Sequence, residues 1–216
     1  MKKTALIWLI AGCFLCSCNS KTISVEPRFV EKVLSDQAPQ HLWTKSFGDV
    51  NMDGKTDILV GGWRSGGLVA YLAPDWEEYI INDSLKIGTD SEICDLNNDG
   101  TNDIVTIDDG NRKLIWLRGP DWQYQQIDSK TLHDAKVADF NNDGLLDIVA
   151  RNQAEFGNRS GDTLYFYIQK PVGEWSKYTQ PVVNGEGIKV ADVNGNGRLD
   201  VIINQYWLEN TGNISI

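Results

Sequence analysis

Short runs of aliphatic and β-branched residues recur along this chain, and each follows an acidic segment. They read Asp-Ile-Leu-Val, Asp-Ile-Val-Thr, Asp-Ile-Val-Ala and Asp-Val-Ile-Ile, at residues 57–60, 103–106, 147–150 and 200–203. Runs of this length and composition are typical of buried β-strands. A lead-in segment precedes each acidic segment, at residues 41–50, 89–96, 133–140 and 186–193. The pattern therefore predicts two strands joined by an acidic loop, four times over.

A third apolar run follows in the first three repeats, at residues 68–72, 114–117 and 164–168. A tryptophan then opens a further short segment in each of them, at residues 76–81, 122–127 and 175–179. Four antiparallel strands per repeat, at this spacing, predict an all-β protein built as a β-propeller, with one blade per repeat. The tryptophans are interpreted as packing residues between blades.

The fourth repeat is incomplete, because its third strand begins at 207–210 and no outer strand follows before residue 216. Residues 28–34 alternate in a way that suits a strand, and we expect this strand to fill the vacant place and close a four-bladed ring. The alternative is that the chain is a fragment of a propeller with seven or eight blades.

The acidic loops share oxygen-bearing side chains at positions 1, 3, 5 and 9, a glycine at position 6 and a carbonyl at position 7. This spacing curls a loop around a hard cation, and the oxygen ligands favour Ca2+. The predicted ligands of the first two loops are Asp49, Asn51, Asp53, Lys55 and Asp57, then Asp95, Asn97, Asp99, Thr101 and Asp103. Those of the other two are Asp139, Asn141, Asp143, Leu145 and Asp147, then Asp192, Asn194, Asn196, Arg198 and Asp200. Asn196 replaces a carboxylate, so the fourth site is expected to bind more weakly.

Two other kinds of loop share parts of this pattern. An EF-hand begins in the same way but needs a bidentate Glu at position 12 between two helices. Position 12 holds Val60, Thr106, Ala150 and Ile203. A loop of Asp and Asn residues that only caps its own backbone is common as a single copy. Four copies would gather much negative charge without a cation, which favours the ion.

Composition adds limits on partners and location. The chain has 216 residues and a formal net charge of −10, which argues against nucleic acid as a partner.

Residues 1–18 have the lysines, apolar run and terminal cysteine of a signal segment. Residues 15–18 resemble a bacterial lipobox, which implies lipidation at Cys18; ordinary signal cleavage is the alternative. Residues 19–27 then form a tether and 28–216 the propeller. Cys94 is expected to be a small core residue.

The loops and their flanking strands resemble the FG-GAP or VCBS-type repeats of integrin-like propellers over about residues 28–212. Phe47-Gly48-Asp49 matches the dipeptide that names the repeat. The resemblance implies the propeller fold and calcium. The family includes adhesins, lectin-like modules and domains of carbohydrate lyases, so it does not select an activity.

A narrower likeness lies in residues 133–135, 185–187 and 206–210, which are similar to stretches of secreted bacterial proteins like aldos-2-ulose dehydratase. His133 and Glu186 stand at the same place before their loops, and Asp90 and Asp134 one residue later in theirs. These four are the candidate catalytic residues at the mouth of the channel, with Arg64 and Arg151 nearby. The alternative is that they form hydrogen bonds between blades.

The sequence leads to three hypotheses. The first is a secreted, calcium-stabilised module, lipid-anchored to a bacterial membrane, that binds carbohydrate or extracellular protein. The second is a sugar lyase or dehydratase that uses the His/Asp/Glu cluster. The third is an adhesion scaffold without a small-molecule ligand.

Overall fold

The computed structural model describes residues 29–152, 161–171 and 173–212. By contacts the chain divides into two units, Met1–Lys32 and Val33–Ile216, and the strands of the described residues lie in the second. The expected signal segment, its lipidated Cys18 and the tether at 19–27 lie outside the described residues. Within those residues there is no helix long and apolar enough to cross a membrane.

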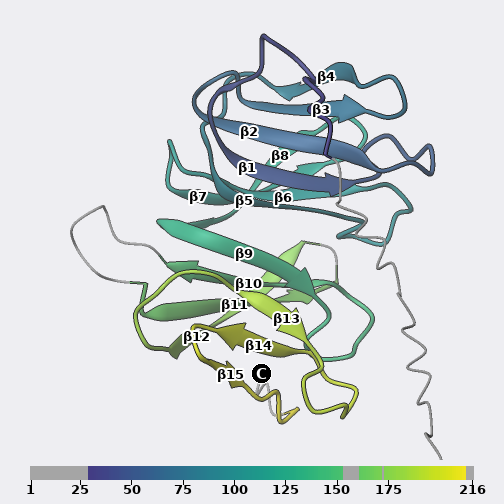
Figure 1. Ribbon diagram of the computed structural model, residues 1–216. Helices are drawn as coiled ribbons and strands as arrows, with labels where there is room; N and C mark the ends of the chain where they lie inside the picture. The colour runs from purple at the N-terminus through teal and green to yellow at the C-terminus, as the bar shows by residue number, and fades with distance from the viewer. Residues whose placement is uncertain (1–28, 153–160, 172, 213–216) are drawn as a thin grey trace, which may run out of the picture. The chain divides into compact units, whose positions relative to one another are not determined.

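The strands form four antiparallel sheets in chain order (Figure 1). The first contains β1 (Gln40–Gly48), β2 (Asp57–Ser65), β3 (Leu68–Leu72) and β4 (Glu77–Asn82). The second contains β5 (Ile87–Cys94), β6 (Asp103–Asp108), β7 (Lys113–Arg118) and β8 (Gln123–Ser129). The third contains β9 (Leu132–Ala138), β10 (Asp147–Asn152), β11 (Thr163–Lys170) and β12 (Glu174–Pro181). The fourth contains β13 (Lys189–Ala191), β14 (Asp200–Ile203) and β15 (Tyr206–Leu208).

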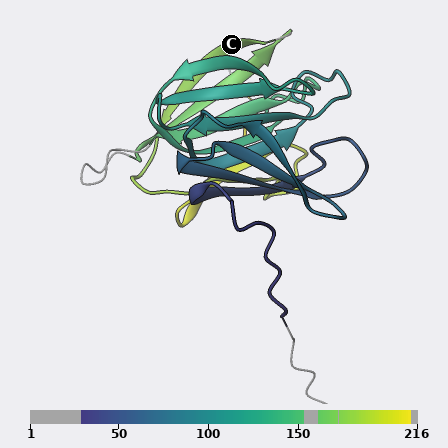
Figure 2. The same cartoon turned by 90° about the horizontal axis from the view of Figure 1, so that it is seen from above.

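Each sheet is an up-and-down meander, which is the structure of a propeller blade. Figure 1 labels the strands of the four sheets, and Figure 2 shows the same strands from above. The first strands of consecutive sheets are neighbours, since β1 contacts β5, β5 contacts β9 and β9 contacts β13. The predicted all-β architecture of four-stranded blades is confirmed, and the fourth sheet has three strands within the described residues.

The core lies between the sheets because successive side chains of a strand point to opposite faces. In the second sheet, Ile104 packs against the first sheet, whereas its neighbour Val105 packs against the third. A strand that is buried on both faces needs apolar residues at successive positions, which explains the continuous apolar sequence at 103–106 and 147–150. Cys94 packs against the hydrophobic cluster between the second and third sheets. Burial raises the pKa of its thiol to about 12. Cys94 is half-buried at the edge of this core.

The strand predicted at 28–34 is wrong for the described residues 29–34, which form no strand. Phe29, Val30 and Val33 are largely exposed, and Leu34 packs beside the first sheet, against Val60 and its neighbours. The alternating pattern is not sufficient here because a strand needs a backbone edge to pair with. The fourth sheet therefore has three strands within the described residues, and this segment does not complete it.

Candidate functional site: the acidic loops and the inner-strand cluster

The acidic loops join the first two strands of every sheet and have one conformation. In the first loop the Asp49 carboxylate accepts hydrogen bonds from the amides of Asp53 (3.0 Å) and Gly54 (2.8 Å). The side-chain oxygen of Asn51 accepts from the same Asp53 amide at 3.1 Å. The other three loops repeat these contacts. Oxygens of positions 1 and 3 therefore converge on the amide of position 5 in all four loops.

Glycine at position 6 is required by the backbone and not by lack of space. Gly54, Gly100, Gly144 and Gly197 have φ between 82° and 87°. A Cβ on any of them would have no atom within 4 Å. Since side chains disfavour this left-handed region, the conformation itself selects glycine. The predicted role of this position in curling the loop is consistent with these angles.

The position 9 aspartates have a structural role that sequence reasoning missed. All four are fully buried: Asp57, Asp103, Asp147 and Asp200. One oxygen of each accepts the amide of position 2, and the other accepts an amide at the end of the third strand or just after it. Burial raises the pKa of Asp147 to about 6. Each of these carboxylates therefore connects its loop to the C-terminal end of the third strand of its own blade, and its role as a calcium ligand stays a prediction.

The donor set that remains for an ion is made of oxygens at the exposed side of each loop. In the first loop these are the side chains of Asp49, Asn51 and Asp53 and the carbonyl of Lys55. Within the described residues no group of three or more His, Cys, Asp or Glu side chains gathers as a metal site. The predicted donors are a mixed set of carboxylate, amide and backbone oxygens, a kind of set that suits Ca2+ better than a transition metal.

Hydrogen bonds connect neighbouring loops. The side-chain amide of Asn98 donates to the carbonyl of Gly144 at 3.0 Å, and that of Asn142 donates to Gly197 at 3.1 Å. Both donors stand at position 4 of one loop and both acceptors at position 6 of the next. These bonds connect the second loop to the third and the third loop to the fourth.

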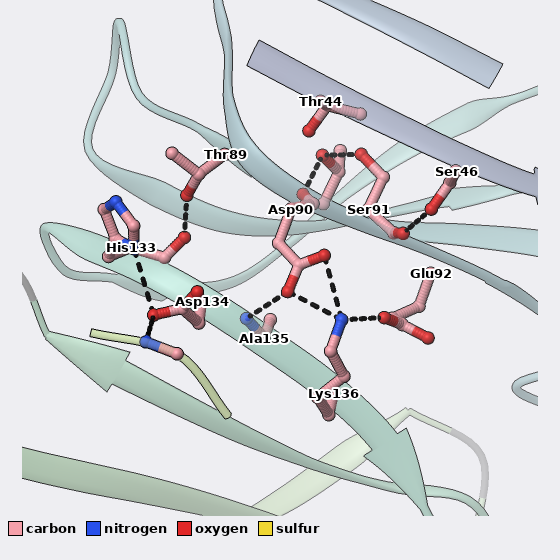
Figure 3. Close-up of polar contacts among 12 residues, drawn as sticks. Thr44, Ser46, Thr89, Asp90, Ser91, Glu92, His133, Asp134, Ala135 and Lys136 are labelled. Atoms are coloured by element: carbon pink, nitrogen blue, oxygen red, sulfur yellow. Dashed lines mark hydrogen bonds and ion pairs between the residues drawn. The ribbon is translucent and has the colours of Figure 1, made fainter. Parts of the chain in front are cut away.

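The candidate catalytic residues lie on the first strands of the second and third sheets and beside the fourth (Figure 3). His133 Nδ1 is 3.0 Å from Asp134 Oδ2, which also accepts the amide of Gly187 at 2.9 Å. The hydrogen bond to Asp134 raises the pKa of His133 although burial opposes it. Burial opposes ionisation of Asp134, but the hydrogen bonds from His133 and Gly187 outweigh it and lower its pKa. Glu186 is exposed and adjoins Gly187.

Asp90 belongs to a separate ion pair with a lysine that the sequence did not single out. Lys136 Nζ lies 2.9 and 2.8 Å from the two Asp90 oxygens and also contacts Glu92 (Figure 3). The Ala135 amide donates to Asp90 at 3.3 Å. Burial raises the pKa of Asp90, against the attraction of Lys136. The signal was present in the sequence, because Asp90 and Glu92, like Asp134 and Lys136, share one face at a spacing of two.

Of the two arginines expected nearby, Arg64 is exposed and Arg151 is fully buried. The guanidinium of Arg151 donates to three carbonyls and one side chain, those of Gly161, Val183, Gly187 and Asn204. It anchors the segment between β12 and β13 to the third sheet. The cluster thus combines one His–Asp pair with interblade contacts, and both interpretations of it have support.

In the comparison with known families, one family model matches the chain at two places. The model of the FG-GAP-like repeat matches residues 95–150 and again residues 139–203, so the two matches together span three of the four acidic loops and half of the chain. No curated protein matches the chain.

Proposed function

This chain belongs to the family of FG-GAP-like repeat proteins, and on this premise we propose that it is a calcium-binding propeller module. It works outside the cytoplasm, held to a bacterial membrane by a lipid on Cys18, and binds carbohydrate or another protein. Within this proposal Ca2+ is part of the fold and the ligand is bound without chemical change.

One observation carries the calcium proposal: four loops repeat the same arrangement of oxygens around a left-handed glycine. Asp139, Asn141 and Asp143 would hold the ion in the third loop, with the carbonyl of Leu145. A bound cation neutralises carboxylates that otherwise repel one another. Because Asn98 and Asn142 connect adjacent loops, ordering one loop also orders the contact between blades.

The test is thermal unfolding of the chain in excess chelator and in millimolar Ca2+, together with a metal count by elemental analysis. An ion that binds only the folded state stabilises it by about 2.7 kcal/mol when present at 100 times its Kd. We expect a higher Tm in Ca2+. Asp143→Ala should remove one strong site, Asp192→Ala should have less effect, and the exposed Asp75→Ala, outside the loops, serves as control. Equal melting curves and a metal count near zero would contradict the proposal.

The anchor is tested separately, in a bacterial host supplied with labelled fatty acid. Label should enter the full-length chain and be absent from Cys18→Ala. A mature protein that starts further along the chain and carries no label would contradict lipidation while leaving the calcium proposal intact.

A second candidate function rests on the His133–Asp134 pair, since a histidine oriented by a carboxylate suits general acid–base chemistry. The reaction class is elimination from an oxidised or acidic sugar. Two observations favour the binding module: Asp90 is engaged by Lys136, and Asp134 also accepts the Gly187 amide. Turnover in a sugar screen that His133→Ala abolishes without lowering the Tm would reverse this preference.

A further inference from the structure

Two tryptophans of the first sheet lie outside the core. Trp43 of β1 and Trp63 of β2 belong to none of the hydrophobic clusters formed by the described residues. By contrast, Trp122 and Trp175 pack against the clusters between the sheets, as expected of packing residues, and Trp116 is fully buried. Packing between sheets therefore does not explain Trp43 and Trp63.

The two rings stack on one another, and together they are here called the tryptophan platform. Their centroids are 5.4 Å apart and their planes differ by 16°, which is a favourable arrangement for aromatic rings. The indole N–H of Trp63 donates to the carboxylate of Asp109, in the turn between β6 and β7 of the second sheet. Trp63 is thus fixed from the neighbouring sheet and supports Trp43, which is 37% exposed.

The tryptophan platform lies at the end of the inner strands that is remote from the acidic loops. Trp43 and His133 both stand six residues before the first position of their loops. Thr44 donates to the carbonyl of Gly88 at 2.9 Å, which connects β1 to β5. Thr89 donates to the carbonyl of His133, which connects β5 to β9 (Figure 3). The platform and His133 therefore share one end of three adjacent strands, and the acidic loops follow the other end.

The charges beside the platform limit which ligands it can hold. Lys45 Nζ donates to the carbonyls of Leu42 at 3.0 Å and Trp43 at 3.4 Å, so an ammonium group lies next to the platform. A cation over the ring would otherwise be attracted to it, but this charge repels it. The formal net charge of −10 works against an anion. An uncharged ligand with an apolar face is favoured.

A β-linked glucose unit satisfies these conditions. All the hydroxyl groups of its pyranose ring are equatorial, so each face of the ring presents only axial C–H groups. Such a face can lie flat on the exposed side of the Trp43 indole, and removing both surfaces from water stabilises the contact. The hydroxyls point outward from the edge of the sugar ring, where the Lys45 ammonium can donate to them.

A protein partner suits this surface less well. The centre of a protein interface gathers buried aromatic and apolar side chains, and charged groups are depleted there. The exposed residues close to the two tryptophans in sequence include His41, Lys45 and Arg64. One indole face is enough for a sugar ring, whereas a standard protein interface buries a far larger area.

We propose that the tryptophan platform binds a neutral glycan of β-linked glucose, one ring of which stacks on Trp43. Trp63 and Asp109 are positioning residues that hold the Trp43 ring in place. This inference rests on the proposed function of a carbohydrate-binding module, and it adds the residues and the class of sugar. The site does not include the acidic loops, so Ca2+ affects it through the stability of the fold alone.

The probes are cellohexaose and laminarihexaose, two neutral oligomers of β-linked glucose. Each is titrated into the full chain in Ca2+, and binding is followed by calorimetry and by the indole N–H signals in 15N-edited NMR spectra. Loss of one indole signal in Trp43→Phe assigns that signal. We expect at least one of the two sugars to bind saturably and to shift the Trp43 signal. Saturation transfer should be strongest to the axial protons of one sugar face.

Matched variants locate the binding. Trp43→Ala should weaken it about tenfold, and Trp43→Phe should weaken it less because an aromatic face remains. Asp109→Leu should weaken it by a smaller factor than Trp43→Ala and broaden the Trp43 signal, because Trp63 loses its hydrogen bond. Trp76→Ala is the control, since Trp76 is 39% exposed in the same sheet but outside the platform. Circular dichroism and Tm confirm that the variants are folded.

Three outcomes would overturn the proposal. If neither sugar shifts the Trp43 signal at millimolar concentration, the platform does not bind glucans, and a protein ligand remains for the module. If a sugar binds and Trp43→Ala leaves its affinity unchanged, the module binds carbohydrate at another place. If tetramethylammonium chloride shifts the Trp43 signal and neither sugar does, the platform is a cation site. Equal melting curves in Ca2+ and chelator, with sugar binding retained, would contradict the calcium proposal alone.

Discussion

Position 4 of the acidic loops shows how one side chain adjusts a repeated structure. It is left-handed in every loop, with φ of 63° at Met52, 57° at Asn98, 58° at Asn142 and 73° at Gly195. Asn and Gly tolerate this region, whereas an ordinary side chain there costs about 1–2 kcal/mol. Met52 also lacks the amide with which Asn98 and Asn142 contact the next loop. Position 4 of the first loop therefore carries the residue that is least suited to this left-handed conformation.

Met52→Asn is expected to stabilise the protein by about 1 kcal/mol, because it relieves the left-handed strain. The new amide can also donate to the carbonyl of Gly100, by analogy with Asn98. Denaturant unfolding of Met52→Asn and Met52→Gly separates the two effects, since glycine relieves strain but cannot donate. A midpoint for Met52→Asn at or below that of the parent chain would contradict this account.

The His133–Asp134 pair predicts a pH dependence of stability. The hydrogen bond to Asp134, with the charges of Asp134, Glu186 and Asp90, raises the folded-state pKa of His133 above the ordinary histidine value of 6.5. The contribution is fully present below that value, where both states are protonated, and is lost as pH rises through the folded-state pKa. Stability from this pair therefore falls above about pH 6.5.

The measurement is Tm from pH 5.5 to pH 8.5 for the parent chain and Asp134→Asn. The parent should lose more stability across this window than the variant does. An NMR titration in the His41→Gln background, which leaves His133 as the sole histidine, should show its pKa falling in Asp134→Asn. Parallel Tm curves would indicate that the pair contributes nothing through its charge.

At the scale of one blade, the buried position 9 aspartate connects the acidic loop to the end of the third strand. The oxygens of Asp147 accept the amides of Phe140, before the loop's turn, and of Gln169, in β11. Both amides are inside the protein, where an unsatisfied polar group costs about 1–3 kcal/mol. Asp143, four residues earlier, is exposed and bonds only within its loop.

The two aspartates should therefore differ in how calcium affects their variants. We expect Asp147→Ala to lower the unfolding free energy by about 2–5 kcal/mol in chelator as well as in Ca2+. Asp143→Ala should have little effect in chelator and remove most of one site's stabilisation in Ca2+. Denaturant unfolding under both conditions is the measurement. Equal losses for both variants in chelator would mean that position 9 has no separate structural role.

At the scale of the whole domain, the fourth sheet depends on the third. It has three strands in its described part, and the buried Arg151 connects β10 to the loop that leads into it. Local opening is easiest where burial and pairing are least. We expect amide exchange to be fastest in β13–β15 and to increase further there in Arg151→Met, which leaves the carbonyls of Val183 and Gly187 unpaired.

Hydrogen exchange read by mass spectrometry distinguishes this from a uniform loss of stability. The first sheet, at the other end of the strand order, is the internal control, and its protection should change little. If exchange in β2 and β3 rises as much as in β14, the domain unfolds as one unit and Arg151 contributes to global stability alone.

Patterns that are local in the chain could be read from the sequence. The buried runs at 57–60 and 103–106 became the central strands, and the short aromatic segments became outer strands, because period and β-branching act within a few residues. Glycine at position 6 follows equally from local backbone geometry. The calcium and lipid predictions are of the same kind, and they await the experiments described above.

What the tertiary structure decided depends on partners far apart in the chain. The strand expected at 28–34 had the right alternation, yet a strand exists only where another edge pairs with it. Asp147 had the spacing of a ligand, but its pair of hydrogen bonds arises where Phe140 and Gln169 meet in the folded blade. The pairing of Asp90 with Lys136 likewise requires β5 and β9 to lie side by side. Sequence alone determined the repeating element, and packing determined which of its polar groups face solvent and which face each other.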